Sequence, residues 1–395
     1  MNMSKHSLKP AWPRVPFADV VHLNTDRVAD PAAAGLERYV GIEHITPGDL
    51  RVRSWGLVAE GTTFTNHFRP GQVLFPKRRA YQRKVAVADF EGVCSGDIYV
   101  FESRDPAVLL PDLLPFICQT DCFFDHAVGT SAGSLSPRTN WSHLAAYEFP
   151  LPPPDEQRRL AEVLGAMSAV GESYRSLALE AERLWQSLAF KRFSDAYACG
   201  KLMRLSDLLV YASDGPFGSK LKTKHYDKSG ARVIRLQNID ANSFNDTDRA
   251  YISEEYYRSV LADYAVYPGD VLVAGLGDDS IRSGRACIAP ANLGPAINKA
   301  DCYCLRPGEK LDAEYLVAFF NSPQGADQSK SFAQGTTRIR LNLGNIRRMK
   351  VPVPEIDLQR QIAAELANVY QTGQDAQLRL VQQGTMSRLA LSYLD

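Results

Sequence analysis

Apolar and polar positions follow a helical period over a long central stretch of the chain, from residue 155 to residue 199. Its apolar residues recur at alternating steps of three and four: Leu160, Val163, Met167, Val170, Tyr174, Leu177, Ala181, Leu184 and Leu188. Kept over about four heptads, this spacing is typical of a helix that packs along a partner helix. At about 1.5 Å per residue the predicted helix is about 60 Å long.

The residues that flank this stretch mark where the helix begins and ends. Pro152-Pro-Pro154 favours an extended approach, because a residue before proline is kept out of the helical region. Asp155 then stands where an N-cap carboxylate accepts main-chain N–H groups. Gly200 follows as the predicted end.

A second helical stretch begins at Asp357 and runs to the last residue. Its apolar positions are less regular, at Ile362, Leu366, Val369, Ala376 and Leu380, and Gly373 and Gly384 weaken its middle. Packed along the first helix, it would bury its stripe in an antiparallel pair. The alternative is that each helix lies on its own globular domain.

The two helix starts are copies of one another. At an offset of 202, seven of sixteen positions from 149 to 164 are identical to their counterparts: Pro150, Pro152, Asp155, Gln157, Arg158, Ala161 and Leu164. Upstream, Gly133, Arg138 and Asn140 match Gly335, Arg340 and Asn342 at the same offset. Further pairs have offsets between 194 and 204, including Asp97-Ile-Tyr99 with Asp301-Cys-Tyr303. A shared frame with loops of different length explains this drift.

Between the helices, short β-branched or aromatic runs alternate with Gly, Pro and Asp turns, and a short helix is expected near 113–118 and near 315–321. The sequence therefore predicts an α+β fold with two similar globular domains and two long helices forming an antiparallel coiled coil. The predicted boundaries are a first globular domain at 1–150, a central helical spacer at 151–200, a second globular domain at 201–352 and a C-terminal helical spacer at 353–395.

Composition indicates a soluble globular protein. The 395 residues are 45% hydrophobic and 23% charged, and no run approaches the roughly 18 apolar residues of a membrane span. The start lacks a secretory signal and the seven cysteines predict reduced thiols, so a cytoplasmic location is expected. The formal net charge is zero. Any surface that faces nucleic acid must therefore be a local basic patch, or one completed by a partner subunit.

Enzymatic motifs are sparse. The chain has no G-x-x-x-x-G-K-[ST] phosphate loop, no H-E-x-x-H and no amino-methyltransferase motif. Gly129-Thr-Ser131-Ala-Gly133 matches the G-x-S-x-G nucleophile elbow. That elbow needs a strand before it and a helix after it, whereas Ser134-Leu-Ser-Pro-Arg follows. The duplicate at 331–335 lacks the serine, which argues against a catalytic Ser131.

Several stretches together resemble the specificity subunit of type I restriction-modification systems, often called HsdS. They are the two Pro-x-Pro-x-x-Asp-x-Gln-Arg helix starts, Asp214-Gly-Pro-Phe-Gly-Ser-Lys220, Val233-Ile-Arg-Leu-Gln-Asn-Ile239 and Tyr39-Val-Gly-Ile-Glu-His-Ile45. The resemblance covers nearly the whole chain in the family's order. It implies that each globular domain is a target recognition domain, reading one half of a bipartite, asymmetric DNA target, while the helix pair sets the spacer.

The resemblance also implies that the chain is not itself an enzyme and that the chemistry belongs to its partners. Two modification subunits would dock on the helical regions and bring S-adenosylmethionine, and restriction subunits would bring ATP-driven translocation and cleavage. No cofactor is expected on this chain. Double-stranded DNA is the expected ligand, and no membrane is expected.

DNA-contacting residues are predicted where cations gather. The first group, around an aromatic residue, is Lys77, Arg78, Arg79, Tyr81, Arg83 and Lys84; the second domain offers Lys220, Lys222, Lys224, Arg282 and Arg285. A third group is Arg138, Arg338, Arg340 and Asn342. Since Arg138 and Arg340 recur in both copies, a shared phosphate or scaffold role is predicted for them. Base reading is predicted for residues that differ between the copies.

Two other functions fit parts of the sequence. A stand-alone hydrolase or nuclease would use Ser131 or an unrecognised set of carboxylates. A coiled-coil scaffold would be indifferent to DNA. A methylation-only or other phage-defence system could use the same reader. The chain alone does not separate these systems, since their distinguishing subunits are other chains.

Overall fold

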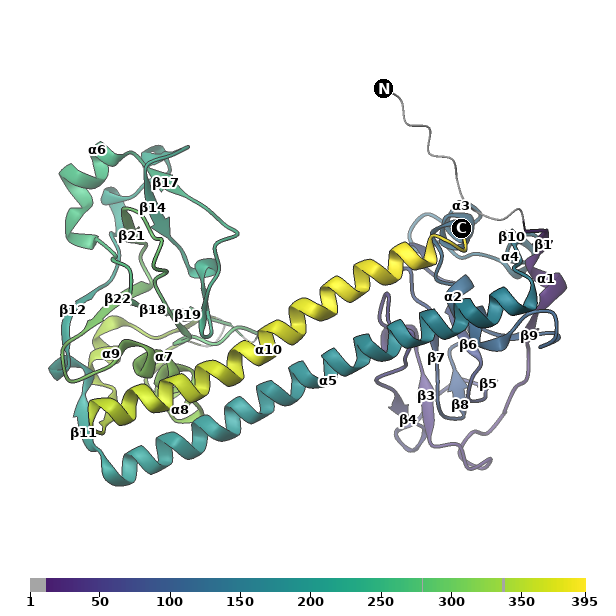
Figure 1. Cartoon of the computed structure of the whole chain (residues 1–395), viewed down its shortest axis with the longest axis horizontal. Coiled ribbons are helices and arrows are strands. Elements are labelled where there is room, and N and C mark those ends of the chain that lie inside the picture. The colour runs from purple at the N-terminus through teal and green to yellow at the C-terminus, as the bar shows by residue number, and fades with distance from the viewer. Residues whose placement is uncertain (1–11, 279, 336–337) are drawn as a thin grey trace. The chain divides into compact units, whose positions relative to one another are not determined.

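The computed structural model describes residues 12–278, 280–335 and 338–395, which form two compact units. Unit 1 comprises the described residues up to 174 together with 379–395, and unit 2 comprises those from 175 to 378. The chain passes between the units only within two long helices, α5 (Pro154–Cys199) and α10 (Ile356–Leu391) (Figure 1). The predicted division into four segments is not tested by these units and stays a prediction.

Unit 1 contains two four-stranded sheets. The first is wholly antiparallel, in the order β2-β9-β6-β7. The second has the order β4-β3-β8-β5, in which β3 and β8 run parallel. The strands are β2 (Val21–Asn24), β3 (Arg38–Val40), β4 (Gly56–Leu57), β5 (Asn66–Phe68), β6 (Val73–Pro76), β7 (Ala86–Val87), β8 (Gly92–Cys94) and β9 (Ile98–Ser103).

Short helices complete the core of unit 1. They are α1 (Phe17–Val20), α2 (Leu114–Ile117), α3 (Asp121–Gly129) and α4 (Trp141–Ala145), and β1 (Arg14–Pro16) pairs with β10 (Glu148–Pro150). Phe17, Phe75, Phe101 and Phe123 are fully buried and meet ring against ring. The predicted short helix near 113–118 is present as α2.

Unit 2 repeats most of this topology and differs at the edge strands of its second sheet. Its antiparallel sheet has the order β12-β22-β18-β20, and its second sheet, β13-β17-β14-β21, again contains one parallel pair, β14 with β21. The strands are β12 (Leu209–Ser213), β13 (Tyr226–Asp227), β14 (Ala231–Ile234), β17 (Tyr251–Ile252), β18 (Val271–Ala274), β20 (Ala286–Ile288), β21 (Ala296–Asn298) and β22 (Cys302–Pro307). The shared topology confirms the predicted pair of similar α+β domains.

The remaining elements of unit 2 are shorter. Strand pairs are β11 (Lys201–Arg204) with β24 (Lys350–Val353), β15 (Ile239–Asp240) with β16 (Ser243–Phe244), and β19 (Leu276–Gly277) with β23 (Ile339–Arg340). The helices are α6 (Glu254–Tyr256), followed by a π-helical turn (Tyr257–Leu261), then α7 (Ala313–Asn321), α8 (Pro323–Phe332) and α9 (Leu343–Arg348). The short helix expected near 315–321 is α7.

The long helices begin one residue earlier than predicted. α5 starts at Pro154, whose fixed φ suits the first helical position. Asp155 and Asp357 therefore lie within the first turns of α5 and α10, and the predicted N-cap at Asp155 is wrong. A carboxylate in the first turn still favours the helix dipole, which explains why the residue recurs.

The predicted apolar seam of α5 is only partly buried. Val163 and Val170 in unit 1 and Leu177 and Leu184 in unit 2 are each 43–54% exposed. The face that packs inward instead carries small residues, among them Ala161, Gly171, Ala181 and Ala189, with Trp185 beside them. Small side chains allow two helices to approach closely, so the contact follows residue size as well as hydrophobicity.

α5 and α10 contact each other within each unit. In unit 1, Gln383 Nε2 donates to the carbonyl of Met167, and a Cβ on Gly171 would lie 2.7 Å from Gln383 Oε1. In unit 2, Arg192 Nε donates to Glu365 Oε2 at 2.7 Å. Gly373, predicted only to weaken α10, lies against Ala181: a Cβ there would be 3.2 Å from the Ala181 Cβ.

Replacing Gly373 by leucine should destabilise the helix contact of unit 2, because the added side chain overlaps Ala181. We expect the free energy of unfolding to fall by about 1–3 kcal/mol. The matched control is Gly384→Ala in the same helix, where no neighbouring atom lies within 4 Å. There the free energy should rise by about 0.5–1 kcal/mol. Denaturant unfolding of both variants checks this, and equal effects would contradict the close contact.

Candidate nucleic-acid interface

The predicted basic cluster of unit 1 lies on two loops that are held together by main-chain bonds. We call them the paired loops of unit 1: residues 77–85, which follow β6, and residues 130–140, which precede α4. The Arg79 N–H donates to the Pro137 carbonyl at 2.8 Å, and the Thr139 N–H donates to that of Lys77 at 2.9 Å. Arg78 and Arg138 also form a β-bridge. The structure thus brings Arg138 to the main cluster, from 54 or more residues away in sequence.

The turn at the centre of the first loop has an unusual backbone. Arg79 (φ 58°) and Arg83 (φ 54°) both adopt the left-handed conformation, which is uncommon for residues other than glycine. They flank a single 3-10 turn at Ala80–Gln82, and Tyr81 within it is 54% exposed. Such strained residues gather at functional sites. Here they present an aromatic ring to solvent between two arginines.

Carboxylates neutralise part of this cluster. Asp97 serves two arginines: its Oδ2 lies 3.4 Å from Arg78 Nη1, and its Oδ1 lies 3.1 Å from Arg138 Nε. Arg83 pairs with Asp121 and lies 4.7 Å from the ring centroid of Phe124. The paired loops contain six cationic side chains and contact two carboxylates, so they keep a net positive charge. This local excess is what a nucleic-acid-binding surface needs on a chain whose total net charge is zero.

The two lysines of the cluster, Lys77 and Lys84, contact other parts of unit 1, whereas lysines of a fully solvated patch would have no such contacts. Lys77 Nζ lies 4.8 Å from the ring centroid of Tyr99. Lys84 Nζ donates to the Ile42 carbonyl at 2.8 Å, and burial lowers the pKa of its ammonium group. Lys84 is therefore a structural residue here, and the more exposed Arg79, Tyr81 and Arg138 are the residues that the geometry offers to a ligand.

Unit 2 contains the same pairing of loops. After β18 the chain forms β19, which pairs with β23 so that Leu276 stands opposite Arg340. Arg340 Nε donates to Asp301 Oδ1 at 2.7 Å, the counterpart of the contact between Arg138 and Asp97. We call residues 275–285 and 333–342 the paired loops of unit 2. Residues 279, 336 and 337 within these ranges fall outside the described part of the chain.

The comparisons with known proteins agree with this duplicated frame. Residues 218–379 match the family described as the type I restriction modification DNA specificity domain. The specificity subunit of the Escherichia coli type I restriction enzyme EcoDI is 28% identical over 185 residues, which cover 42% of this chain and 40% of that protein.

Solved structures match over nearly the whole chain. The S subunit of a type I restriction-modification system from M. genitalium has a TM-score of 0.61 at 15% identity, covering 100% of this chain and 98% of that one. A chain from a structure of type I restriction-modification complex assembly and conformational transition has a TM-score of 0.57 at 19% identity, covering 99% and 98%. The chain is thus similar to type I restriction-modification specificity subunits in fold over nearly its whole length and in sequence over part of it. The match to the curated relative spans less than half of that relative's length, and the structural likenesses bear on the fold.

The two recurring arginines, Arg138 and Arg340, have a scaffold contact in common. Each Arg–Asp pair ties the loop before a short helix to the loop before the last strand of the antiparallel sheet. Arg138 and Arg340 nevertheless remain about half exposed, at 53% and 47%. The sequence did not identify Asp97 and Asp301 as the partners of these arginines, although the two aspartates occupy equivalent positions in the repeat.

Other predicted residues of unit 2 divide into interior and surface groups. Arg285 donates to the carbonyls of Ile239, Leu236, Leu276 and Arg282, and Arg282 donates to that of Phe320. Burial lowers the pKa of both guanidinium groups. These two arginines therefore hold loops together. Asn342 caps α9, accepting the Asn345 N–H at 2.8 Å, whereas Arg338 is exposed.

Lys220, Lys222 and Lys224 lie on a different loop of unit 2. All three are exposed, and none forms an ion pair with a carboxylate of the described residues. Lys220 Nζ lies 5.3 Å from the ring centroid of Tyr264, and its carbonyl accepts the Tyr256 hydroxyl at 2.7 Å. Among the residues that the structure describes, no interaction links this loop directly to Arg338 or Arg340. The loop is an unpaired cationic surface suited to phosphate.

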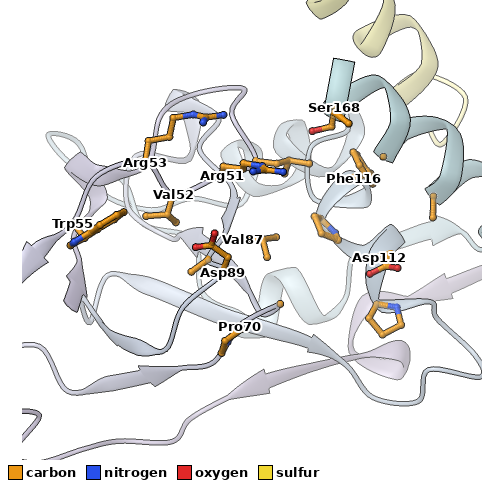
Figure 2. A pocket seen from close by; sticks show the side chains of 18 of the residues that line it. Arg51, Val52, Arg53, Trp55, Pro70, Val87, Asp89, Asp112, Phe116 and Ser168 are labelled. Carbon is orange, nitrogen blue, oxygen red and sulfur yellow. The ribbon is translucent and has the colours of Figure 1, made fainter. Parts of the chain in front are cut away.

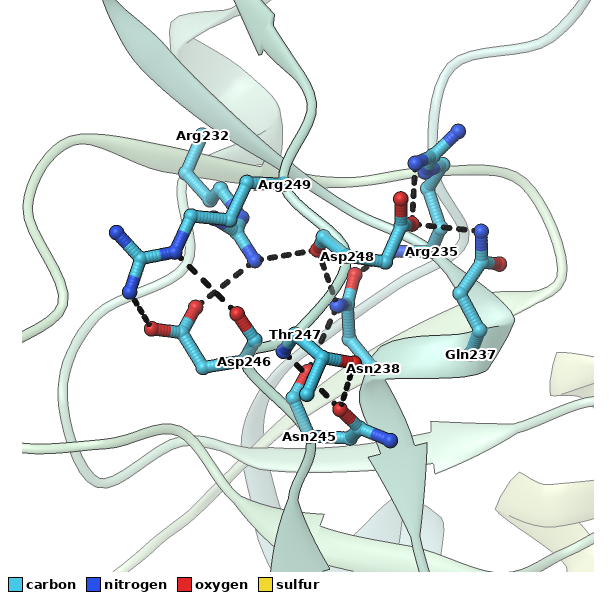
Figure 3. A network of polar contacts seen from close by, with 9 residues as sticks. All are labelled: Arg232, Arg235, Gln237, Asn238, Asn245, Asp246, Thr247, Asp248 and Arg249. Carbon is cyan, nitrogen blue, oxygen red and sulfur yellow. Dashed lines mark hydrogen bonds and ion pairs between the residues drawn. The ribbon is translucent and has the colours of Figure 1, made fainter. Parts of the chain in front are cut away.

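A neighbouring network contains three arginines that the sequence did not single out. Arg232 and Arg249 both contact Asp246, and Arg235 and Gln237 contact Asp248 (Figure 3). Asn238, fully buried, donates to the carbonyls of Asn245 and Asp248 at 2.8 Å each. The arginines are neutralised internally, so the network shapes the loop at 245–249 more than it adds positive charge.

Unit 1 also contains a groove between one loop and α5. Its volume is about 1010 Å³, and Figure 2 shows the loop that carries Arg51, Arg53 and Trp55 facing Ser168 of the helix. Arg53 donates to Asp49 at 2.6 Å and also pairs with Glu172, so its charge is already matched. None of the residues that line the groove belongs to the paired loops of unit 1, and none is a predicted DNA-contacting residue.

The described residues contain no arrangement that suits catalysis at Ser131. Its hydroxyl donates to the Ala127 carbonyl at 2.7 Å, and it follows helix α3 where a nucleophile elbow needs a strand. No described group of three or more His, Cys, Asp or Glu could hold a metal ion. Five cysteines are buried as free thiols, and Cys122 and Cys199 are exposed. Within the same residues, no helix is long and apolar enough to cross a membrane.

Proposed function

We propose that this chain is the DNA-binding specificity subunit of a type I restriction-modification complex, in which unit 1 and unit 2 each read one half of a bipartite, asymmetric target. The observation that carries the proposal is that both units have the same loop scaffold but expose different side chains on it. The duplicated Arg–Asp pairs fix the paired loops in both units. What the loops present differs: Arg79 and Tyr81 in unit 1, Ile281 and Arg338 in unit 2.

Because the paired loops of the two units expose different side chains, we expect the two units to read different DNA half-sites. Arginine donates bidentately to guanine in the major groove, tyrosine stacks or contacts bases, and isoleucine can contact a thymine methyl group. α5 and α10 would set the gap between the two half-sites, because a stiff helix pair holds a separation that a flexible linker could not. The spacer must then suit the DNA repeat of about 34 Å.

The chemistry of the complex would lie on other chains. Two modification subunits would dock on the helical regions and supply S-adenosylmethionine, and restriction subunits would supply ATP-driven cleavage. In unit 1, the exposed Val163 and Val170 are seven residues apart, as are Leu177 and Leu184 in unit 2. This is the repeat on which a further helix packs, which supports helical docking.

Selection from random duplexes tests the proposal. The purified complex with its modification subunits should enrich two short, different motifs separated by a constant gap. A stand-alone enzyme or a scaffold indifferent to DNA would enrich nothing. One uninterrupted motif would also contradict two readers.

The unpaired lysine loop gives a second test. Changing Lys220, Lys222 and Lys224 to alanine should weaken DNA binding without changing the selected motif, because phosphate contacts carry no base information. The slope of log K against log salt should become shallower by up to about 3. Binding titrations between low and moderate salt measure this. An altered second motif with an unchanged slope would contradict the phosphate role.

A further inference from the structure

A buried glutamine ties the start of α5 to its own globular unit. Gln157 is 1% exposed and uses its whole amide. Its Oε1 accepts the Leu110 N–H at 2.7 Å, and its Nε2 donates to the carbonyls of Val108 at 2.8 Å and Pro152 at 2.9 Å. One side chain thus joins the first helical turn, the proline run before it, and the loop before α2.

The start of α10 is tied to unit 2 by the same arrangement. Gln359 is fully buried, accepts the Asp312 N–H at 2.9 Å, and donates to the carbonyls of Lys310 at 3.0 Å and Pro354 at 2.8 Å. Each of these residues lies 202 positions after its counterpart in unit 1. The partner residues differ in kind, Val108 against Lys310 and Leu110 against Asp312. The main-chain groups that they offer are the same.

Each glutamine follows a two-stranded pair that closes the globular part of its unit. β1 pairs with β10, and β11 pairs with β24. β10 and β24 lead through Pro152 and Pro354 directly into α5 and α10. The carbonyls of these two prolines are among the glutamine acceptors, so the bend between strand and helix is closed by a hydrogen bond across it.

This geometry makes a stiff joint. Three hydrogen bonds to groups on two separate segments fix both the direction and the rotation of the first helical turn. Since the amide is buried, water cannot replace a lost partner without opening the joint. The cost of bending at this point is therefore higher than at an ordinary exit from a domain.

We infer that Gln157 and Gln359 are positioning residues that limit which spacer lengths the chain accepts. The inference rests on the proposed function, in which the helices hold two readers at a set separation. Adding one base pair shifts a half-site by about 3.4 Å and rotates it by about 36°. A stiff joint cannot follow that change, whereas a loosened joint can tilt and turn to meet it.

The test compares spacer preference in the variant Gln157→Met, which keeps the side-chain length but removes all three hydrogen bonds. The purified complex with its modification subunits is titrated with duplexes that carry the selected half-sites at the native spacer and at one base pair more or less. We expect the preference for the native spacer to fall by about tenfold, with the half-sites unchanged. Gln359→Met should have the same effect, because its bonds are equivalent. The control is Gln361→Met, exposed on the same helix.

The outcomes separate this inference from the proposed function. If the wild-type complex shows no bipartite preference at all, the proposed function fails first. If it does, and both variants keep the native spacer preference, the positioning role is overturned. Loss of binding to every duplex would also overturn it, because the glutamines would then serve folding alone. Thermal unfolding of each variant, measured in parallel, shows whether spacer preference and stability change independently.

Discussion

Removing seven residues from each long helix should shorten the spacer of the recognised DNA site and leave both half-sites unchanged. The deletion takes 174–180 from α5 and 374–380 from α10, where the chain passes between the units. A loss of seven residues keeps the packing face to within about 20°. At about 1.5 Å per residue each helix loses about 10 Å, which corresponds to at most about three base pairs.

Methylation sequencing of cells that express the deletion variant with its partner subunits measures the new spacer. The matched control replaces the exposed Leu179 by glutamine at full length, and it should keep the native spacer. Deleting 174–180 alone puts the two helices out of register and should abolish modification. An unchanged spacer in the double deletion would show that the helices do not measure the gap.

Changing Arg79 to glycine and Tyr81 to serine should abolish reading of the first half-site without destabilising unit 1. Arg79 occupies the left-handed region, which glycine adopts at no steric cost, and Tyr81 is 54% exposed. Stability should therefore remain within about 0.5 kcal/mol. Affinity for the native site should fall by about 30-fold or more, since base contacts of this kind contribute about 1–3 kcal/mol each.

Binding titrations and thermal unfolding of the same preparation check this result. The control changes Arg69 and Arg104 to alanine, which removes two exposed arginines of unit 1 outside the paired loops. That control should bind within a few-fold of wild type, and any loss should not depend on sequence. If the loop variant still enriches both motifs, the paired loops of unit 1 do not read the first half-site.

The broad architecture could be predicted because it depends on repeating local signals. Proline runs, heptads and a 202-residue offset indicated the duplicated domains and the long helices. The packing face of α5 could not be predicted from hydrophobicity alone. Ala181 and Gly373 pack because they are small, and Val163 and Leu184 stay exposed although they are apolar. The N-cap at Asp155 failed because Pro154 is itself suited to the first helical position.

The candidate interface was predictable as a basic region but not in detail. Arg282 and Arg285 carry the same charge in sequence as Arg79, yet their half-buried guanidinium groups donate to main-chain carbonyls of neighbouring segments. Which arginine turns inward depends on loop conformation, which a single sequence does not encode in its composition. The left-handed conformations of Arg79 and Arg83 likewise carry no residue signature, since glycine or asparagine would be expected there.

In the proposed function, one chain carries two different readers at a set separation. Single-molecule methylation sequencing of DNA from cells that express this chain with its modification subunits tests it most directly. We expect one methylated motif made of two unlike halves with a constant, unread spacer between them, absent when the chain is omitted. A single contiguous motif, two identical halves, or methylation that does not depend on the chain would contradict it.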